Sequence, residues 1–504
     1  MKKTDNLFDL IHSLSKSEKR HFKITSEQHV INCNNQYIKL FNTINKSKNI
    51  SEKEFIKQNK NENFIKYYSR NKNYLYQLIL KSLIQYNFNM SIENSVLFNI
   101  LFIETLYKKN LLNACAKLLK KTKHTAYKHE QYSLLLKIID WEIRLELKLL
   151  NKEDHIKTLL NEETAIQSNL QAINKLKNIY YKLYFLTHKN HTANRTKNLS
   201  HQLKKIIQSI QYKKTWPSVA KGYYFNSMAT YYSFTSNANK ELLYQKKILD
   251  LYNQHPQQIE VNPDRYISTI SNYAYSLLRI ENYKEMYHQI ATIKNFNKKY
   301  NIKINTITET HIFYITNNIE MNWMIYSKNF KNIQAINDSI TEGLKQHKKS
   351  INILYKQTLY YNIALLNFID NNFNNALDWI NNITLYSSNN NSFDIYYMAM
   401  LIKFITHFEL RNYQLLNNSL NNFKKLLKNK RKLFNVEKEI IRFLTQYTND
   451  PSPDKTDFIQ FKKNLQNIIS DPFEKSILKY FDFITWAESK IQNKSFKEVL
   501  TKRC

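Results

Sequence analysis

Glycine is almost absent from this sequence. Only Gly222 and Gly343 occur among 504 residues, whereas average usage would give about 35. Glycine supplies the positive-φ residues of tight β-hairpins and the backbone of loops that hold phosphate groups. The sequence therefore excludes a P-loop, a dinucleotide-binding fingerprint and a meander of tight hairpins. It predicts an all-α protein whose helices are joined by polar turns.

Proline and cysteine are also scarce. Because Pro breaks helix interiors, long helices fit the six prolines, which lie where the apolar pattern pauses: Pro217, Pro256, Pro263, Pro451, Pro453 and Pro472. Cys33, Cys115 and Cys504 are far apart and form no CxxC pair, so we expect a reduced cytoplasmic location without a disulfide framework. No apolar run approaches the ~18 residues of a membrane span, and Asp5 and Asp9 interrupt any secretory signal. We expect no membrane insertion.

The net charge of +34 raises the question of nucleic-acid binding. Only ten of the 75 basic residues are Arg, although Arg is preferred for bidentate contacts with phosphates and bases. Lys, Asn, Ile and Tyr, which are all abundant, share A/T-rich codons, so genome composition accounts for much of the charge. Nucleic acid is a possible partner but is not favoured.

From about residue 92, amphipathic helices alternate with short polar turns that are followed by an aromatic residue. In NYAYSLLRIENYKEMYHQIATI, Ala274 and Leu277 precede the turn, Tyr283 follows it, and Met286 and Ile290 continue the second helix. This order is that of the tetratricopeptide consensus. At 42% hydrophobic residues, the chain can bury a sizeable core. We predict an α-solenoid of stacked helical hairpins; a non-repeating helical bundle is the alternative.

The hairpins are longer than the 34 residues of a strict tetratricopeptide unit. The aromatic residues after the turns are 47, 43 and 40 residues apart: Tyr283, Phe330, Phe373 and Tyr413. The turn positions that carry glycine in the consensus hold Glu281, Lys328 and Asn371. Asn tolerates the left-handed conformation better than most residues, which partly explains how the chain manages without glycine.

Three regions are expected along the chain: a helical unit at 1–90, a tetratricopeptide-like array at 91–446, and C-terminal capping helices at 447–504 after the break NDPSPDKTD. The first region caps the array or forms a degenerate helix-turn-helix. In the latter view, Arg70 and Lys72 begin a recognition helix and contact phosphates or bases.

Four segments resemble an uncharacterised family of tetratricopeptide-like helical-repeat proteins typical of Bacteroidota. They are SLSKSEKRHFKI, KNYLYQLILKSL, LRNYQLLNNSLNNFKKLLKNK and YFDFITWAESKIQNKSF. The similarity covers essentially the whole chain and rests on the four segments jointly. It implies a helical-repeat architecture in a bacterial cytoplasm. It implies no activity and no catalytic residues.

The search for chemistry finds little. The chain has no HExxH and no GxSxG motif. The spacing between Arg195 and His201 occurs once, which is no more often than chance predicts for a chain of this composition. We expect a non-enzymatic protein with no catalytic residue, no metal site and no cofactor. A basic cluster near the C-terminus is interpreted as a solvated helix face, with phosphate contact as the minority reading: Lys424, Lys425, Lys428 and Arg431.

The leading hypothesis is a scaffold that binds a peptide or helix of an unknown partner protein on the inner face of the array. The repeat template places six residues on that face: Tyr223, Asn226, Thr230, Ser268, Ser271 and Tyr275. In the next but one hairpin the same face is apolar, at Tyr361, Leu365 and Phe368; it anchors an apolar side chain or is covered by the C-terminal segment. The alternative hypothesis is a nucleic-acid-associated regulator that uses the basic N-terminal unit and the Lys-rich faces.

Overall fold

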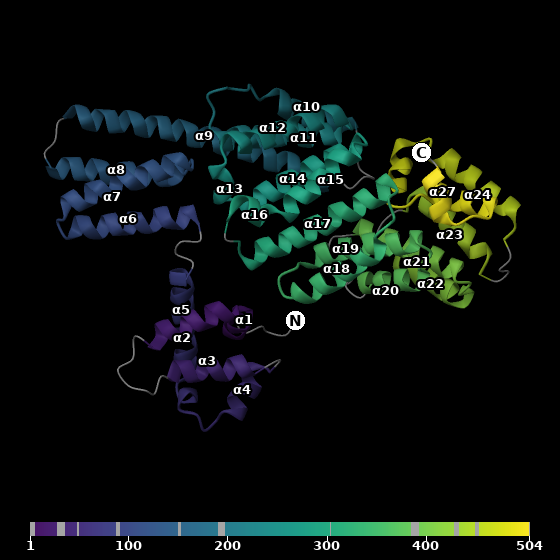
Figure 1. The fold of residues 1–504 in the computed structure, drawn as a ribbon, viewed down its shortest axis with the longest axis horizontal. Coiled ribbons are helices and arrows are strands. Elements are labelled where there is room, and N and C mark those ends of the chain that lie inside the picture. The colour runs from purple at the N-terminus through teal and green to yellow at the C-terminus, as the bar shows by residue number, and fades with distance from the viewer. Residues whose placement is uncertain are drawn as a thin grey trace. The chain divides into compact units, whose positions relative to one another are not determined.

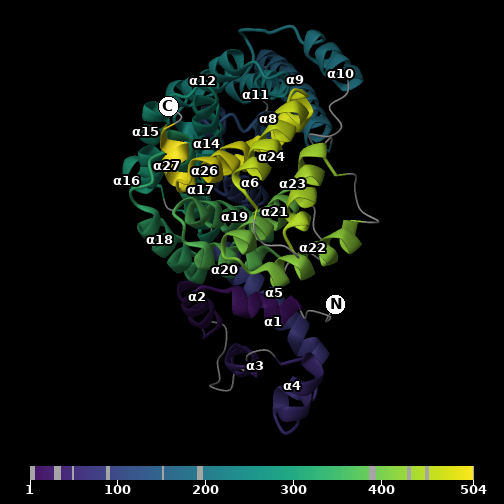
Figure 2. The same ribbon diagram turned by 90° about the vertical axis from the view of Figure 1, so that its right-hand side faces the viewer.

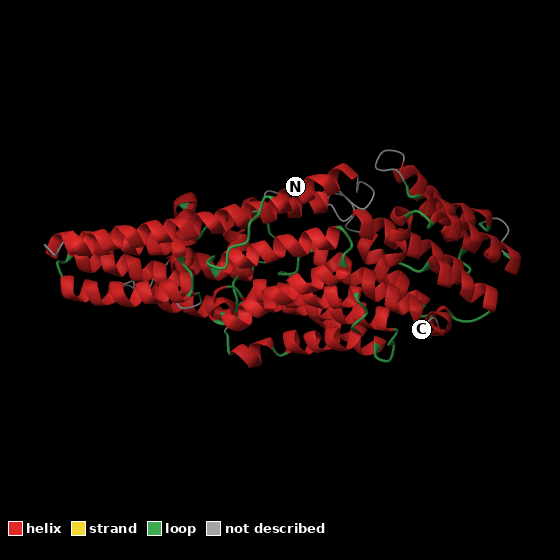
Figure 3. Ribbon diagram, turned by 90° about the horizontal axis from the view of Figure 1, so that it is seen from above, coloured by secondary structure: helices red, strands yellow, loops and turns green. Residues whose placement is uncertain are grey.

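The protein is built from helices, which confirms the all-α prediction. The computed structural model describes residues 6–27, 36–47, 50–86, 91–149, 153–189, 197–302, 304–384, 393–427, 433–448 and 453–502. These residues contain no β-strand (Figure 3). The chain divides into two compact units, Met1–Leu170 and Gln171–Cys504, and the long helix α9 (Glu153–Lys189) runs from the first into the second.

The first unit opens with five helices around one apolar cluster that includes the fully buried Phe22 and Phe41. Local sequence signals mark helix starts here. Before the helix Glu52–Gln58, for example, Ser51 and Glu54 form a capping box in which each side chain accepts a hydrogen bond from the other's backbone N–H. The helices are α1 (Asn6–Ser13), α2 (Lys16–Glu27), α3 (Gln36–Lys46), α4 (Glu52–Gln58) and α5 (Tyr68–Tyr86).

A second apolar cluster in the first unit lies between α6 (Ile92–Lys108), α7 (Leu112–Lys128), α8 (Tyr132–Leu149) and the beginning of α9. Lys123 lies between two acidic side chains at its edge, 2.5 Å from Glu142 and 2.8 Å from Glu162. The two carboxylates raise the pKa of Lys123 against the lowering effect of burial. Through these two ion pairs Lys123 joins α7 to α8 and α9.

In the described part of the second unit, five helical hairpins follow one another before the C-terminal helices. Figure 1 shows their helices in chain order. The first helices of successive hairpins contact one another from α14 to α17, α19 and α21. The pairs are α11 (Ser218–Phe234) with α12 (Ala238–Gln254), α14 (Pro263–Arg279) with α15 (Tyr283–Lys294), α17 (Thr306–Ser327) with α18 (Ile333–Gln346), α19 (Ile353–Ile369) with α20 (Phe373–Thr384), and α21 (Phe393–Glu409) with α22 (Tyr413–Leu427). The shorter helix α10 (Lys197–Gln208) precedes the first hairpin, and two short helices connect successive hairpins: α13 (Gln257–Val261) and α16 (Phe296–Tyr300).

Each of these hairpins turns on one left-handed residue that is not glycine. Their φ angles lie between 56° and 60°: Ser236, Glu281, Lys328, Asn371 and Arg411. Three of these residues, Glu281, Lys328 and Asn371, stand at the turn positions that carry glycine in the tetratricopeptide consensus. In all five turns the next residue is Asn. In the second hairpin this Asn ends one helix and begins the next: the Asn282 N–H donates to Leu277 O at 3.0 Å, and its Oδ1 accepts from Glu285 N at 3.2 Å.

The C-terminal helices pack against the middle of the second unit (Figure 2). Tyr361 Oη on α19 donates to Tyr480 O at 3.0 Å, and Phe368 lies 5.3 Å from Phe481 and 5.8 Å from Phe496 between ring centroids. Two roles are expected for the apolar face of α19, and the structure shows the second: the C-terminal segment covers this face. The helices are α23 (Asn435–Gln446), α24 (Lys455–Ile468), α25 (Pro472–Lys475), α26 (Phe483–Gln492) and α27 (Phe496–Lys502).

Among the described residues, none of the helices combines the length and the apolar character that crossing a bilayer needs. The prediction of no membrane insertion agrees with this.

The two glycines have opposite structural roles, and alanine substitutions separate them. A Cβ at Gly343 on α18 would lie 2.0 Å from Phe313 Cε2, whereas at Gly222 on α11 the nearest atom is Arg265 Nη2 at 3.9 Å. Gly343→Ala should lower the free energy of unfolding by about 1–3 kcal/mol, because the Phe313 ring must move. Gly222→Ala should raise it by about 0.5–1 kcal/mol through helix propensity. Urea unfolding measures both; equal effects would contradict the close approach at Gly343.

His407 on α21 should make the protein sensitive to mild acid. Its side chain is buried, and its Nδ1 has no hydrogen-bond partner among the residues that the structure describes. Burial lowers its pKa to about 4, with Lys403 adding to the effect. Since the unfolded chain binds a proton near pH 6.5, stability is lost as the pH falls from about 6.5 towards 4. His407→Phe should remove about 2 kcal/mol of that loss.

The measurement is urea unfolding of wild type and His407→Phe at pH 7 and 4.5. Comparing the two proteins at each pH cancels the contribution of every other titrating group. A difference in stability that stays constant with pH would show that His407 is not buried in its neutral form.

Candidate functional site

Two adjoining cavities in the second unit form the candidate site, which we call the inner groove. The larger, about 500 Å³, is lined by Tyr180, Tyr181, Tyr184, Tyr223, Asn226, Asn262, Arg265, Ser268, Thr269 and Asn272. The smaller, about 390 Å³, is lined by Tyr180, Tyr184, Thr187, Asn226, Ala229, Thr230, Ser233, Phe234, Glu241, Gln245, Asn272, Tyr275 and Arg279. Four residues line both cavities: Tyr180, Tyr184, Asn226 and Asn272.

Helical periodicity places these side chains together. Tyr223, Asn226 and Thr230 are spaced by three and four residues on α11, so they share one face of that helix. On α14, Ser268, Asn272, Tyr275 and Arg279 repeat the same spacing. The end of α9 contributes tyrosines between these two stripes, and Tyr180 lies 5.9 Å from Tyr223 between ring centroids.

The structure brings five of the six residues predicted for the inner face to the groove. Tyr223 and Ser268 line the larger cavity, Thr230 and Tyr275 the smaller, and Asn226 both. Ser271 is different: it is only 7% exposed and lines neither cavity. Ser271 comes one residue before Asn272 and therefore faces the packed side of α14. The repeat template places Ser271 on the open face, where the structure has Asn272 instead.

Tyr275 also has a structural role that the sequence did not reveal. Its hydroxyl accepts from Asn318 Nδ2 at 2.7 Å, and Asn318 Oδ1 accepts from Asn362 Nδ2 at 2.7 Å. Burial raises the pKa of Tyr275. This chain of polar contacts connects α14, α17 and α19, so replacing Tyr275 by Ala would leave a buried amide without its acceptor.

The sequence reasoning missed residues on both sides of the groove. Tyr180, Tyr181 and Tyr184 come from α9, which has no place in the hairpin template, although the run YYKLYF carries three tyrosines on neighbouring helical positions. Asn272 lies on the predicted face of α14 but was passed over, and Arg265 precedes the part of the helix that the template covers. A search for aromatic residues at helical spacing would have found α9.

The lining of the smaller cavity includes an ion pair between a buried carboxylate and an exposed guanidinium. Glu241 on α12, with a side chain 5% exposed, pairs with Arg279, which is 46% exposed. Desolvation raises the pKa of Glu241, while Arg279 and the Ser233 hydroxyl lower it. Glu241 Oε2 and Gln245 Oε1 are buried acceptors without a hydrogen-bond partner in the described structure. Both oxygens are shielded from solvent, so they belong to the packed wall of the cavity.

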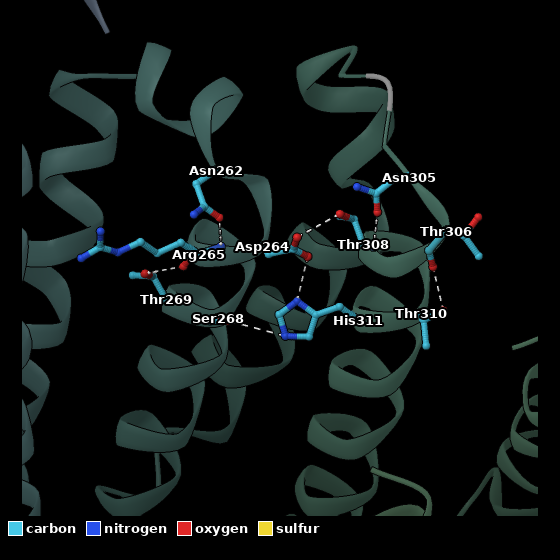
Figure 4. A network of polar contacts seen from close by, with 10 residues as sticks. All are labelled: Asn262, Asp264, Arg265, Ser268, Thr269, Asn305, Thr306, Thr308, Thr310 and His311. Carbon is cyan, nitrogen blue, oxygen red and sulfur yellow. Dashed lines mark hydrogen bonds and ion pairs between the residues drawn. The ribbon is translucent and has the colours of Figure 1, made fainter. Parts of the chain in front are cut away.

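A chain of three polar side chains lies at the edge of the larger cavity (Figure 4). His311 Nδ1 is 3.1 Å from Asp264 Oδ1, Ser268 Oγ is 3.5 Å from His311 Nε2, and Thr308 Oγ1 donates to Asp264 Oδ2 at 3.0 Å. The order resembles nucleophile, base and acid. Ser268 lies inside α14, however, where backbone N–H groups bond within the helix and cannot stabilise an oxyanion. We interpret the chain as a connection between α14 and α17.

A third cavity, of about 360 Å³, lies on α11 and α12 and is walled by aromatic rings. Tyr212 and Phe225 stack with centroids 5.8 Å apart. The ammonium group of Lys247 is 5.0 Å from the Tyr244 ring centroid and 5.8 Å from that of Phe225. The protein's own cation thus covers part of this aromatic surface, which makes the inner groove the better site for a ligand.

The residues considered for nucleic-acid contact belong to both units. Arg70 is exposed on α5, but Lys72 pairs with Glu52 at 2.7 Å, and Asn71 between them is buried and donates to Phe64 O at 2.9 Å. Lys424 and Lys425 are exposed on α22, and Lys424 donates to Thr445 Oγ1 at 3.2 Å. The remaining two residues of that cluster lie outside the described residues: Lys428 and Arg431.

Within the described ranges, no group of three or more His, Cys, Asp or Glu residues is arranged to hold a metal ion. Comparison with protein-family models found no match to this chain, and comparison with curated proteins found no significant match. The class of protein that the structure defines is therefore an all-α protein with a polar, tyrosine-rich groove.

The Glu241–Arg279 pair gives a test of the electrostatics of the smaller cavity. Arg279→Met should lower the free energy of unfolding at pH 7 by about 2 kcal/mol, because it leaves a buried carboxylate without its cation. The pKa of Glu241 should then rise further, so the folded state binds a proton more readily and the loss should shrink as the pH falls from 7 to 5.

Urea unfolding of wild type and Arg279→Met at the two pH values measures both effects. The double variant Arg279→Met/Glu241→Gln is the control, since it removes the uncompensated charge and should recover most of the stability. A loss that is independent of pH would mean that Arg279 acts by packing alone.

Proposed function

We propose that this protein is a non-enzymatic protein–protein interaction scaffold, a tetratricopeptide-like α-solenoid whose inner groove holds a peptide or helix of a partner. The observation that carries the proposal is the pair of adjoining cavities between α9, α11 and α14, lined by Tyr and Asn side chains from three elements. The order in which the first helices of the hairpins contact one another supports the solenoid.

The contrast between two parts of the second unit supports this location. On α19 the corresponding face is apolar and is covered by the chain's own C-terminal segment through Phe368 and Tyr361. On α11 and α14 the corresponding positions are polar and line open cavities. A partner segment therefore meets a surface that needs hydrogen bonds as well as apolar contact.

The lining residues suit an extended peptide or one face of a helix. Tyr side chains give a large contact area at low entropic cost, and Asn, Ser and Thr give adaptable hydrogen bonds. Asn272 is exposed between the two cavities, and its amide can both donate to and accept from a peptide backbone. Together the cavities have room for several side chains.

A nucleic-acid partner fits the groove less well. A strand carries a phosphate at every nucleotide and is bound by a row of cations, whereas the described lining residues of the two cavities include no Lys and only two Arg. One of these, Arg279, is already paired with Glu241. Nucleic-acid binding therefore stands as an outcome of the tests below.

We also propose a cytoplasmic location and membership of the Bacteroidota helical-repeat family, on the four sequence segments and the three widely spaced cysteines. Cys115 is buried and free, and burial raises its pKa, which suits a reduced compartment in which the thiol packs as an apolar group.

Peptide display on the full-length protein tests the function. A library of random 12-residue peptides is selected on the wild type, and enriched peptides are measured by fluorescence anisotropy. Asn272→Ala and Tyr223→Ala should each weaken binding about tenfold or more, because each removes a contact at the centre of the groove. The thermal unfolding midpoint of Asn272→Ala should stay close to that of wild type, since Asn272 is exposed.

Tyr212→Ala is the matched control, as it removes a tyrosine from the neighbouring aromatic cavity. It should leave peptide affinity unchanged. If no peptide is enriched, or if Tyr212→Ala weakens binding while Asn272→Ala does not, the inner groove is not the peptide site.

A further inference from the structure

Arg265 places a positive charge without an anionic partner in the larger cavity. Its guanidinium lies over the Tyr223 ring, 4.4 Å from the centroid, and the side chain is half-buried. Within the described residues, no carboxylate forms an ion pair with it. A guanidinium has five N–H donors in a planar fork that matches a carboxylate, so this cavity is prepared for an anion.

The acidic residues nearest in the fold are already engaged. Asp264 precedes Arg265 in the chain, but it points to α17, where it contacts His311 and Thr308, while Arg265 extends to the opposite side (Figure 4). The hydrogen bond from His311 lowers the pKa of Asp264 and keeps this carboxylate charged. Glu241 is paired with Arg279 in the smaller cavity.

The walls around Arg265 supply further donors. The Oδ1 atom of Asn262 accepts from Arg265 N at 3.0 Å as the N-cap of α14, so its amide N–H₂ is left to donate. The Tyr180 ring lies 5.9 Å from that of Tyr223. Burial raises the pKa of Tyr180, and the positive charge of Arg265 offsets part of this rise. The tyrosine rings that line this cavity reduce the hydration of a bound anion and strengthen its contact with the guanidinium.

We propose that the larger cavity binds the carboxylate of an Asp or Glu side chain in the partner peptide, with Arg265 as its anchor and Tyr180 and Tyr223 against the flanking apolar atoms. This inference rests on the proposed function and specifies the partner's chemistry. A peptide supplies the single charge that a single free guanidinium matches. A nucleic-acid strand would bring further phosphates, whereas the other Arg among the described lining residues, Arg279, is already paired with Glu241.

The experiment compares peptide selection on the full-length wild type, Arg265→Met and Arg265→Lys. Peptides selected on wild type should share an Asp or Glu at one position. In anisotropy measurements, replacing that residue by Asn or Gln should weaken binding about 10- to 100-fold, the range expected for a charge-assisted hydrogen bond.

Arg265→Met should weaken the acidic peptide by a similar factor and abolish the effect of the peptide substitution. This non-additivity shows that the two groups contact each other. Arg265→Lys should recover part of the affinity, because it keeps the charge and loses the fork. Thermal unfolding of each variant confirms that the fold is intact.

Three outcomes overturn the inference. Peptides whose binding depends on Asn272 but which share no acidic position would refute the anchor and leave the proposed function standing. Failure to enrich any groove-dependent peptide would refute the proposed function itself. Binding of oligouridine that persists at 200 mM salt and is lost in Arg265→Met would assign the cavity to a phosphate ligand.

Discussion

The hairpins of the second unit depend on a backbone conformation that costs an L-amino acid about 1–2 kcal/mol. Glu281, Lys328 and Asn371 adopt it, in turns at which the tetratricopeptide consensus carries glycine. Hydrogen bonds from the following residue to the end of the first helix offset the cost, and an Asn such as Asn282 adds the N-cap of the second helix. The turn thereby fixes where the second helix begins, at Tyr283 in this hairpin.

Once the turns are fixed, two kinds of contact join successive hairpins. One is a continuous apolar cluster from Met321 to Phe496, which includes the C-terminal helices. The other is a row of buried amides, in which Asn318 donates to Tyr275 and accepts from Asn362. A buried amide is costly unless it is paired, so these contacts fix the register between helices more strictly than apolar packing does.

Sequence reasoning predicted the helical class, the turn residues and most of one side of the groove. These features depend on local signals: the lack of glycine, and helical spacing such as that of Tyr223 and Asn226. It missed the tyrosines of α9, because their place beside α11 depends on tertiary packing that no repeat template describes. It also misplaced Ser271, since a shift of one residue rotates a helical side chain by about 100°, from the groove into the core.

The position of the groove follows from how the chain uses its own C-terminus. A polar face such as that of α11 and α14 cannot be covered by apolar helices without leaving buried polar groups unpaired. The apolar face of α19 can, and Phe481 and Phe496 cover it. The segment that remains open is therefore the one whose side chains need hydrogen-bonding partners, and Arg265 adds a charge to that need. The partner that we propose, one that brings both amide groups and one negative charge, would supply the hydrogen bonds that this open polar face lacks within the fold.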